Sequence, residues 1–152
     1  MKKGIFLYLL LVLILSCDEN RINCSTVLCA GPPVFQFEII GNNENVLENG
    51  TYPIEDISIT GTDEGSLLLE IRILQFGSGE VTSLIVDNPS WSPQLYELTL
   101  LLGTDFSIPL EINMDLSEAE SCCGGIPEVR SIAIDGELQL LNSGTFFTIT
   151  LD

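Results

Sequence analysis

The feature that most restricts the fold is an alternation of apolar and polar residues with a period of two. In residues 106–114 every even-numbered position is apolar, and every odd-numbered position is serine, proline, glutamate or asparagine. This period is typical of a β-strand with one buried face. Because Pro109 has no N–H to give to a ladder, we expect this strand at a sheet edge or with a bulge at Pro109.

Eight further runs predict strands: residues 34–40, 57–60, 67–73, 81–87, 96–102, 129–134, 137–141 and 145–151. Glycine- and asparagine-rich turns separate them, and Asp135-Gly136 is a strong hairpin signal because a type I′ turn needs positive φ at both central residues. No segment has a convincing helical period. About nine short strands with frequent turn signals predict an all-β protein, an antiparallel β-sandwich of immunoglobulin-like type.

The strands follow a segment of different character. Two lysines in residues 1–4 precede eleven unbroken apolar residues, Ile5 to Leu15, and then Ser16-Cys17. As a helix the apolar run would cover about 16 Å of a hydrocarbon core about 30 Å thick, which is too short for a span. Residues 1–16 are therefore predicted to be a signal peptide that is removed.

The junction carries a recognisable motif. Ile14-Leu15-Ser16-Cys17 resembles the bacterial lipobox, which implies that the Cys17 thiol is alkylated by diacylglycerol and that the new amine is acylated. Asp18-Glu19-Asn20 resembles the surface-export tether of Bacteroidetes lipoproteins, although an ordinary solvated linker has the same composition. Together these residues resemble small surface lipoproteins of Bacteroidetes or flavobacterial type.

That resemblance is specific for residues 1–20 and loose for the remainder. It implies an outer-membrane protein anchored through Cys17 and facing the cell exterior, with the periplasmic face as the alternative, and it implies no activity. The expected organisation is a signal peptide at 1–16, a lipid anchor and tether at 17–33, and a β-sandwich domain at 34–152.

The charge of the chain limits its partners. Without the leader, Arg21, Arg72 and Arg130 are the only basic residues against 22 acidic ones. Such a chain repels phosphate backbones and anionic headgroups, so we expect no nucleic-acid partner and a membrane contact made only by acyl chains on Cys17.

The acidity itself has two interpretations, solubility outside the cell and calcium binding. Candidate calcium ligands fall in three short acidic segments, none of which matches the D-x-[DN]-x-[DN]-G pattern of a calcium loop. These candidates are Glu55, Asp56, Asp63, Glu64, Asp115, Glu118 and Glu120.

Lipidation of Cys17 would leave four of the five cysteines, and four cysteines allow three pairings. We expect two disulfides that join Cys24 and Cys29 to Cys122 and Cys123, because a bond between the adjacent cysteines would be strained. The sequence leaves the partner of each open. Zinc is the competing interpretation, but adjacent cysteines chelate one tetrahedral ion poorly, so no cofactor is expected.

Catalytic chemistry has few residues to use. The whole chain has no histidine and residues 17–152 have no lysine, which excludes histidine-activated nucleophiles and Schiff bases. Only carboxylate chemistry remains, so we expect no enzyme and keep a carboxylate-dependent hydrolase as the weakest alternative.

The only tryptophan, Trp91, lies in a proline-bracketed segment, Asn88-Pro89-Ser90-Trp91-Ser92-Pro93. Its indole either fills one end of the core or is presented as a platform for a sugar ring or a partner protein. The leading functional hypothesis is a lipid-anchored extracytoplasmic module with a non-enzymatic binding or envelope-structural role. The alternative is an accessory glycan-binding component of an outer-membrane uptake system.

Overall fold

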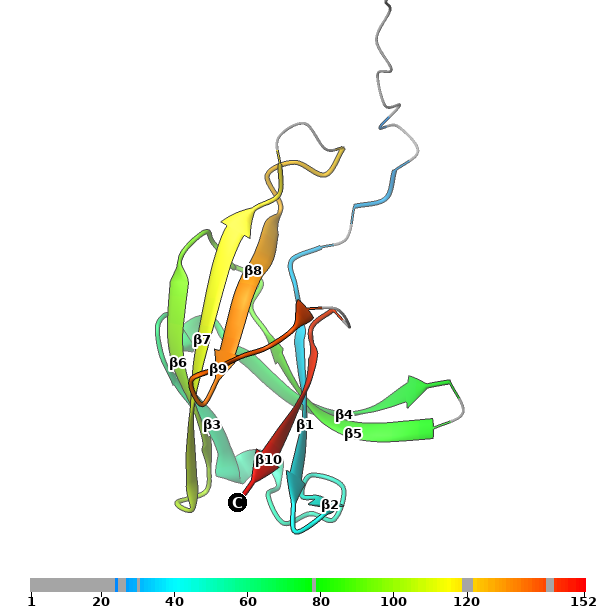
Figure 1. The fold of residues 1–152 in the computed structure, drawn as a ribbon, viewed down its shortest axis with the longest axis vertical. Coiled ribbons are helices and arrows are strands. Elements are labelled where there is room, and N and C mark those ends of the chain that lie inside the picture. The colour runs from blue at the N-terminus through cyan, green and yellow to red at the C-terminus, as the bar shows by residue number, and fades with distance from the viewer. Residues whose placement is uncertain (1–23, 25–26, 30, 78, 119–121, 142–143) are drawn as a thin grey trace, which may run out of the picture.

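Two packed β-sheets contain most of the residues that the structure describes (Figure 1). The computed structural model describes residues 24, 27–29, 31–77, 79–118, 122–141 and 144–152. The ten strands within these ranges are β1 (Phe35–Gly41), β2 (Glu44–Asn45), β3 (Ile57–Gly61), β4 (Leu68–Phe76), β5 (Gly79–Asp87), β6 (Leu95–Leu102), β7 (Phe106–Leu116), β8 (Pro127–Ile134), β9 (Glu137–Leu138) and β10 (Phe146–Leu151). Two short 3-10 turns, η2 (Ile54–Asp56) and η3 (Glu64–Ser66), flank β3.

The order of the strands is of immunoglobulin type. One sheet has the order β10-β1-β5-β4, with β2 paired to β1, and the other has the order β3-β6-β7-β8-β9. Strands β1, β5 and β4 pair as B, E and D do in an immunoglobulin domain, and β3, β6 and β7 pair as C, F and G. The predicted all-β sandwich is confirmed. One departure is that β10 lies beside β1 in parallel, whereas all other pairs are antiparallel.

A second immunoglobulin feature lies at the start of β6. The Tyr96 side chain is fully buried, and its hydroxyl accepts a hydrogen bond from the backbone N–H of Ser92 at 2.9 Å. A tyrosine at the start of strand F that bonds to backbone a few residues upstream is the tyrosine corner of such sandwiches. Here it fixes the path of the chain from β5 into β6.

The alternation predicted from sequence decides which side chains form the core. On β1, the odd-numbered residues Phe35, Phe37 and Ile39 are fully buried, while their neighbours are only partly covered. On β7, the residues from Ile108 to Met114 alternate between buried and exposed in the expected phase. Burying each such side chain contributes roughly 1.5–3 kcal/mol, so the inner faces of the two sheets hold the sandwich together.

Pro109 does not lie where the sequence suggested. Strand β7 is an interior strand between β6 and β8, and its register shift lies between Asn113 and Met114. The β7–β8 ladder begins at Leu110, and the Pro109 carbonyl accepts a hydrogen bond from the Asp135 N–H at 2.8 Å. An N–H at position 109 would therefore point to the β8 side, where β8 has already ended at its turn. Proline at this position costs no hydrogen bond to β6. The expectation of an edge strand or a bulge at Pro109 is wrong.

The Asp135-Gly136 turn joins β8 to β9 as predicted. Its two residues have φ of 51° and 77°, the signs that a type I′ turn requires. Strand β9 is only two residues long, and the chain then crosses from the second sheet to the first and continues as β10 (Figure 1). The predicted strand at 137–141 is therefore mostly a connection between the sheets.

The β4–β5 hairpin extends away from the rest of the sandwich (Figure 1). Its apolar residues are consequently less covered than a core strand would be, and Ile73 is 64% exposed. Phe76 on β4 meets Phe146 on β10 edge to face, with ring centroids 4.9 Å apart. Strands β1 and β5 pair over only three residues, and the end of the hairpin contacts β10 through these two rings.

Gly61 gives a test of the β3–β6 pairing. Its φ is +123°, and a Cβ at this position would lie 2.2 Å from the Glu97 carbonyl oxygen. We predict that Gly61→Ala lowers the free energy of unfolding by about 1–3 kcal/mol in denaturant titrations, from backbone strain and displacement of β6. The control Gly65→Ala, where a Cβ has nothing within 4 Å, should leave stability nearly unchanged. Equal stability of the two variants would contradict the pairing.

Candidate functional site

Two disulfides join the segment before β1 to the loop between β7 and β8. Cys24 pairs with Cys122 and Cys29 pairs with Cys123, with Cα–Cα distances of 5.1 Å and 5.4 Å. The predicted link between the two cysteine pairs is confirmed, and the partner of each is now assigned. Each bond closes a loop of 98 or 94 residues, for which the chain-entropy model gives at most about 4.7 kcal/mol.

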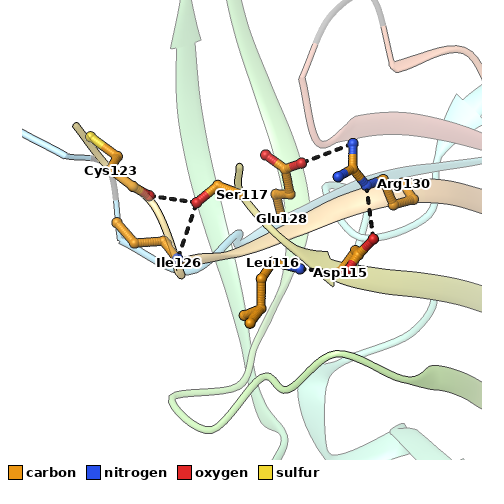
Figure 2. A network of polar contacts seen from close by, with 7 residues as sticks. All are labelled: Asp115, Leu116, Ser117, Cys123, Ile126, Glu128 and Arg130. Carbon is orange, nitrogen blue, oxygen red and sulfur yellow. Dashed lines mark hydrogen bonds and ion pairs between the residues drawn. The ribbon is translucent and has the colours of Figure 1, made fainter. Parts of the chain in front are cut away.

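Ser117 organises the loop that carries the second cysteine pair (Figure 2). Its hydroxyl accepts a hydrogen bond from the Ile126 N–H at 3.1 Å and donates one to the Cys123 carbonyl oxygen. The Ser117 backbone N–H also donates to the Ile126 carbonyl oxygen at 2.9 Å. These bonds close the loop at its base, so Cys123 is held in place on the loop as well as by its disulfide.

An ion-pair network lies on β7 and β8 next to this loop (Figure 2). The Arg130 guanidinium lies between Asp115, at 3.3 Å, and Glu128, at 3.1 Å. All three side chains are 41% exposed or more, and exposed pairs contribute about 0–1 kcal/mol each. Asp115, one of the calcium candidates, is thus paired with the Arg130 guanidinium.

Trp91 closes the core where the segment before β1 enters the sandwich. The indole is only 5% exposed and packs edge-on against Phe35 and Tyr96, with ring centroids 5.5 Å and 4.7 Å away. Its N–H donates to the Pro33 carbonyl oxygen at 2.9 Å. The core interpretation of Trp91 is therefore right, and the platform interpretation is wrong because no face of the indole is presented to solvent.

The other calcium candidates are dispersed. Asp63 accepts a hydrogen bond from the Gln94 side chain at 2.7 Å, and Glu64 accepts one from the Gly61 N–H at 2.8 Å. Within the described ranges, no group of three or more histidine, cysteine, aspartate or glutamate residues could hold a metal ion. Glu120 lies outside those ranges.

The predicted leader and lipid site lie in a part of the chain that the structure does not describe. Residues 1–23 lie outside the described residues, and they include Cys17 and Asp18-Glu19-Asn20. Among the helices that are described, none is long and apolar enough to cross a membrane.

A groove of about 510 Å³ opens between the two sheets, next to the first residues of β7. Strand β10 forms one wall, and β7 with the β8–β9 turn forms the other. Asp135, Glu137 and Asp152 line it, and none of its lining residues is basic. No sequence pattern predicts this groove, because its walls come from strands whose spatial order the periodicity does not specify. We call it the intersheet groove.

A smaller cavity of about 160 Å³ shares Phe106, Leu151 and Asp152 with the groove and is also lined by Tyr52. The Tyr52 hydroxyl donates a hydrogen bond to Asp105 at 3.1 Å. Burial raises the pKa of Tyr52, and the nearby Asp105 carboxylate raises it further. Tyr52 therefore stays protonated over the physiological range and fixes the β6–β7 turn beside the groove.

Comparison with known proteins adds no relative: no family model matches the chain, and no significant match exists among curated proteins or solved structures.

The burial of Trp91 leads to a stability prediction. Trp91→Ala should lower the free energy of unfolding by about 3–5 kcal/mol, because it leaves a cavity and removes the donor to Pro33. Trp91→Phe keeps most of the packing and should lose less. Chemical denaturation followed by circular dichroism measures both. Unchanged stability in Trp91→Ala would contradict the core role.

Proposed function

We propose that the protein is a lipid-anchored extracytoplasmic β-sandwich module with a non-enzymatic binding or envelope-structural role. The observation that carries the proposal is the pair of disulfides that attaches the segment following the proposed anchor to the domain. Disulfides persist in oxidising compartments outside the cytoplasm, which agrees with the leader that precedes Cys17.

The proposed anchor also gives the domain an orientation. Only residues 18–23 lie between Cys17 and Cys24, and fully extended they would reach about 25 Å. Cys24 is bonded to the β7–β8 loop, so a lipid on Cys17 would hold that end of the sandwich next to the bilayer. The opposite end, with the β6–β7 turn and the intersheet groove, would then face away from the membrane.

Two features of the chain support a non-enzymatic role. The chain has no histidine, and the acidic side chains of the intersheet groove are all exposed. A carboxyl group that acts as a general acid is typically buried in an apolar pocket, so these exposed acids suit electrostatic contact better than acid catalysis. The glycan-binding alternative depended on Trp91 as a stacking ring, and burial of the indole leaves it without a supporting observation.

We further propose that the anchor is in the outer membrane and that the domain faces the cell exterior. This rests on the likeness of Asp18-Glu19-Asn20 to a surface-export tether, and on the strong negative charge, which suits a solvated surface.

Replacing the proposed lipid site tests the anchor. We expect wild-type protein to fractionate with membranes and to incorporate an alkyne-labelled fatty acid, and Cys17→Ala to lose both the label and the membrane association. Cys24→Ser, which removes a disulfide cysteine close by, is the matched control and should keep the lipid. A Cys17→Ala protein that still carries label in the membrane fraction would refute the anchor.

Protease treatment of intact cells separates the two faces of the outer membrane. Cleavage of the domain before the envelope is broken is the outcome that the exterior location predicts. Cleavage only after lysis would assign the protein to the periplasmic face.

A further inference from the structure

The outer edge of β10, on the side away from β1, has backbone groups that no strand of the described chain pairs with. The Gln36 N–H bonds to the Thr145 carbonyl oxygen at 2.9 Å, which sets the phase of this parallel ladder. Odd-numbered residues of β10 therefore direct their N–H and C=O groups to β1, and the even-numbered residues, including Thr148 and Thr150, direct theirs to the open edge.

The opposite wall of the intersheet groove has a second open edge. The Pro109 carbonyl oxygen points to the β8 side, where it accepts the Asp135 N–H. Backbone direction alternates along an antiparallel strand, so the N–H and C=O groups of Ser107 point to this side as well. The β7–β8 ladder ends at Leu110, so β8 does not reach Ser107, which lines the groove. Two strand edges, one from each sheet, thus border the same groove.

An open strand edge is a template for another strand, and natural proteins usually block such edges with lysine, proline, a bulge or a covering segment. Strand β10 has neither lysine nor proline, and threonine occupies both exposed positions in its centre. Extended peptides bind at such edges by main-chain hydrogen bonds, with side-chain contacts giving specificity.

The charge of the groove selects the kind of segment. Asp135 and Glu137 line one wall and Asp152 the other, all three are exposed, and no basic residue is among the lining residues. Because the three acids come from both walls, the charges are spread across the groove rather than gathered at one point. This distribution complements a chain with several separated positive charges.

We propose that the intersheet groove binds an extended, positively charged polypeptide segment of a partner protein, which pairs as an added strand with the free edge of β10. This inference rests on the proposed binding role and deepens it by naming the partner class. A second copy of this chain would bring the same acidic groove to the interface, and like charges oppose that pairing.

The position of the groove suits such a partner. The groove includes the beginning of β7, and the disulfide-bonded loop follows the end of β7. The eleven residues of β7 separate the two by about 33 Å, because they span ten steps of 3.3–3.4 Å. A lipid anchor would therefore leave the groove open to proteins away from the membrane.

A proline scan of the β10 edge tests the proposal on the purified full chain. The probe is a fluorescein-labelled peptide of about eight residues with alternating lysine and valine, the length of a typical strand. Thr148→Pro removes an N–H from the open edge without removing a bond to β1, and Thr148→Val is the matched control. Both variants lose the Thr148 hydroxyl bond to Glu38, but only the proline variant loses the N–H.

We expect fluorescence anisotropy to show binding by wild type and Thr148→Val, and at least a tenfold weaker affinity for Thr148→Pro. A second variant, Asp135→Asn with Glu137→Gln, should weaken binding and reduce its dependence on salt. The matching glutamate–valine peptide should not bind. If Thr148→Pro unfolds, hydrogen exchange on wild type decides: the amides of Thr148 and Thr150 should become protected when the peptide is added.

Equal binding by Thr148→Pro and Thr148→Val, equal binding of the glutamate–valine peptide, or no binding of the lysine–valine peptide would each overturn the proposal. So would dimerisation of the chain that Thr148→Pro abolishes, because the edge would then serve a second copy. These measurements do not depend on lipid, so their failure would leave the Cys17 anchor standing.

Discussion

The two disulfides between the segment before β1 and the β7–β8 loop are the constraint on which this structure depends. Without them, little more than the Trp91 bond to Pro33 would hold the described residues before β1 to the sandwich. With them, Cys24 and Cys29 are fixed to the second sheet, although the chain continues from there into β1 of the first sheet. The two disulfides therefore connect the first sheet to the second. They determine which end of the domain lies next to the residues that precede Cys24.

This arrangement gives the two ends of the molecule different features, which fit the proposed anchor and the proposed partner site. At one end, disulfides, the Ser117 hydrogen bonds and the Arg130 ion pairs hold the β7–β8 loop, so the end is suited to attachment (Figure 2). At the other end, β8 stops before it covers the beginning of β7, and β10 has no partner on its outer side within the described chain. The free backbone groups and exposed acids of the intersheet groove result, and the proposed partner site rests on these features.

Much of this fold follows from local sequence, and the rest depends on contacts between distant segments. Period-two alternation sufficed to predict β1 and β7, and Asp135-Gly136 predicted its turn, because strand faces and tight turns are determined by neighbouring residues. The parallel pairing of β1 with β10 was missed, since it joins segments more than 100 residues apart. The burial of Trp91 depends on Pro33 and Phe35 in the same way, and the groove depends on where β8 ends.

Mapping the cysteines of the protein isolated from cells tests the central claim most directly. Free thiols are blocked first, the disulfides are then reduced, and the released thiols are labelled and located by mass spectrometry, with paired serine variants assigning each bond. The account predicts that all four domain cysteines are oxidised, and that Cys24→Ser with Cys122→Ser leaves the Cys29–Cys123 bond intact without exposing a thiol. Four free thiols, or a Cys24–Cys29 bond, would contradict it.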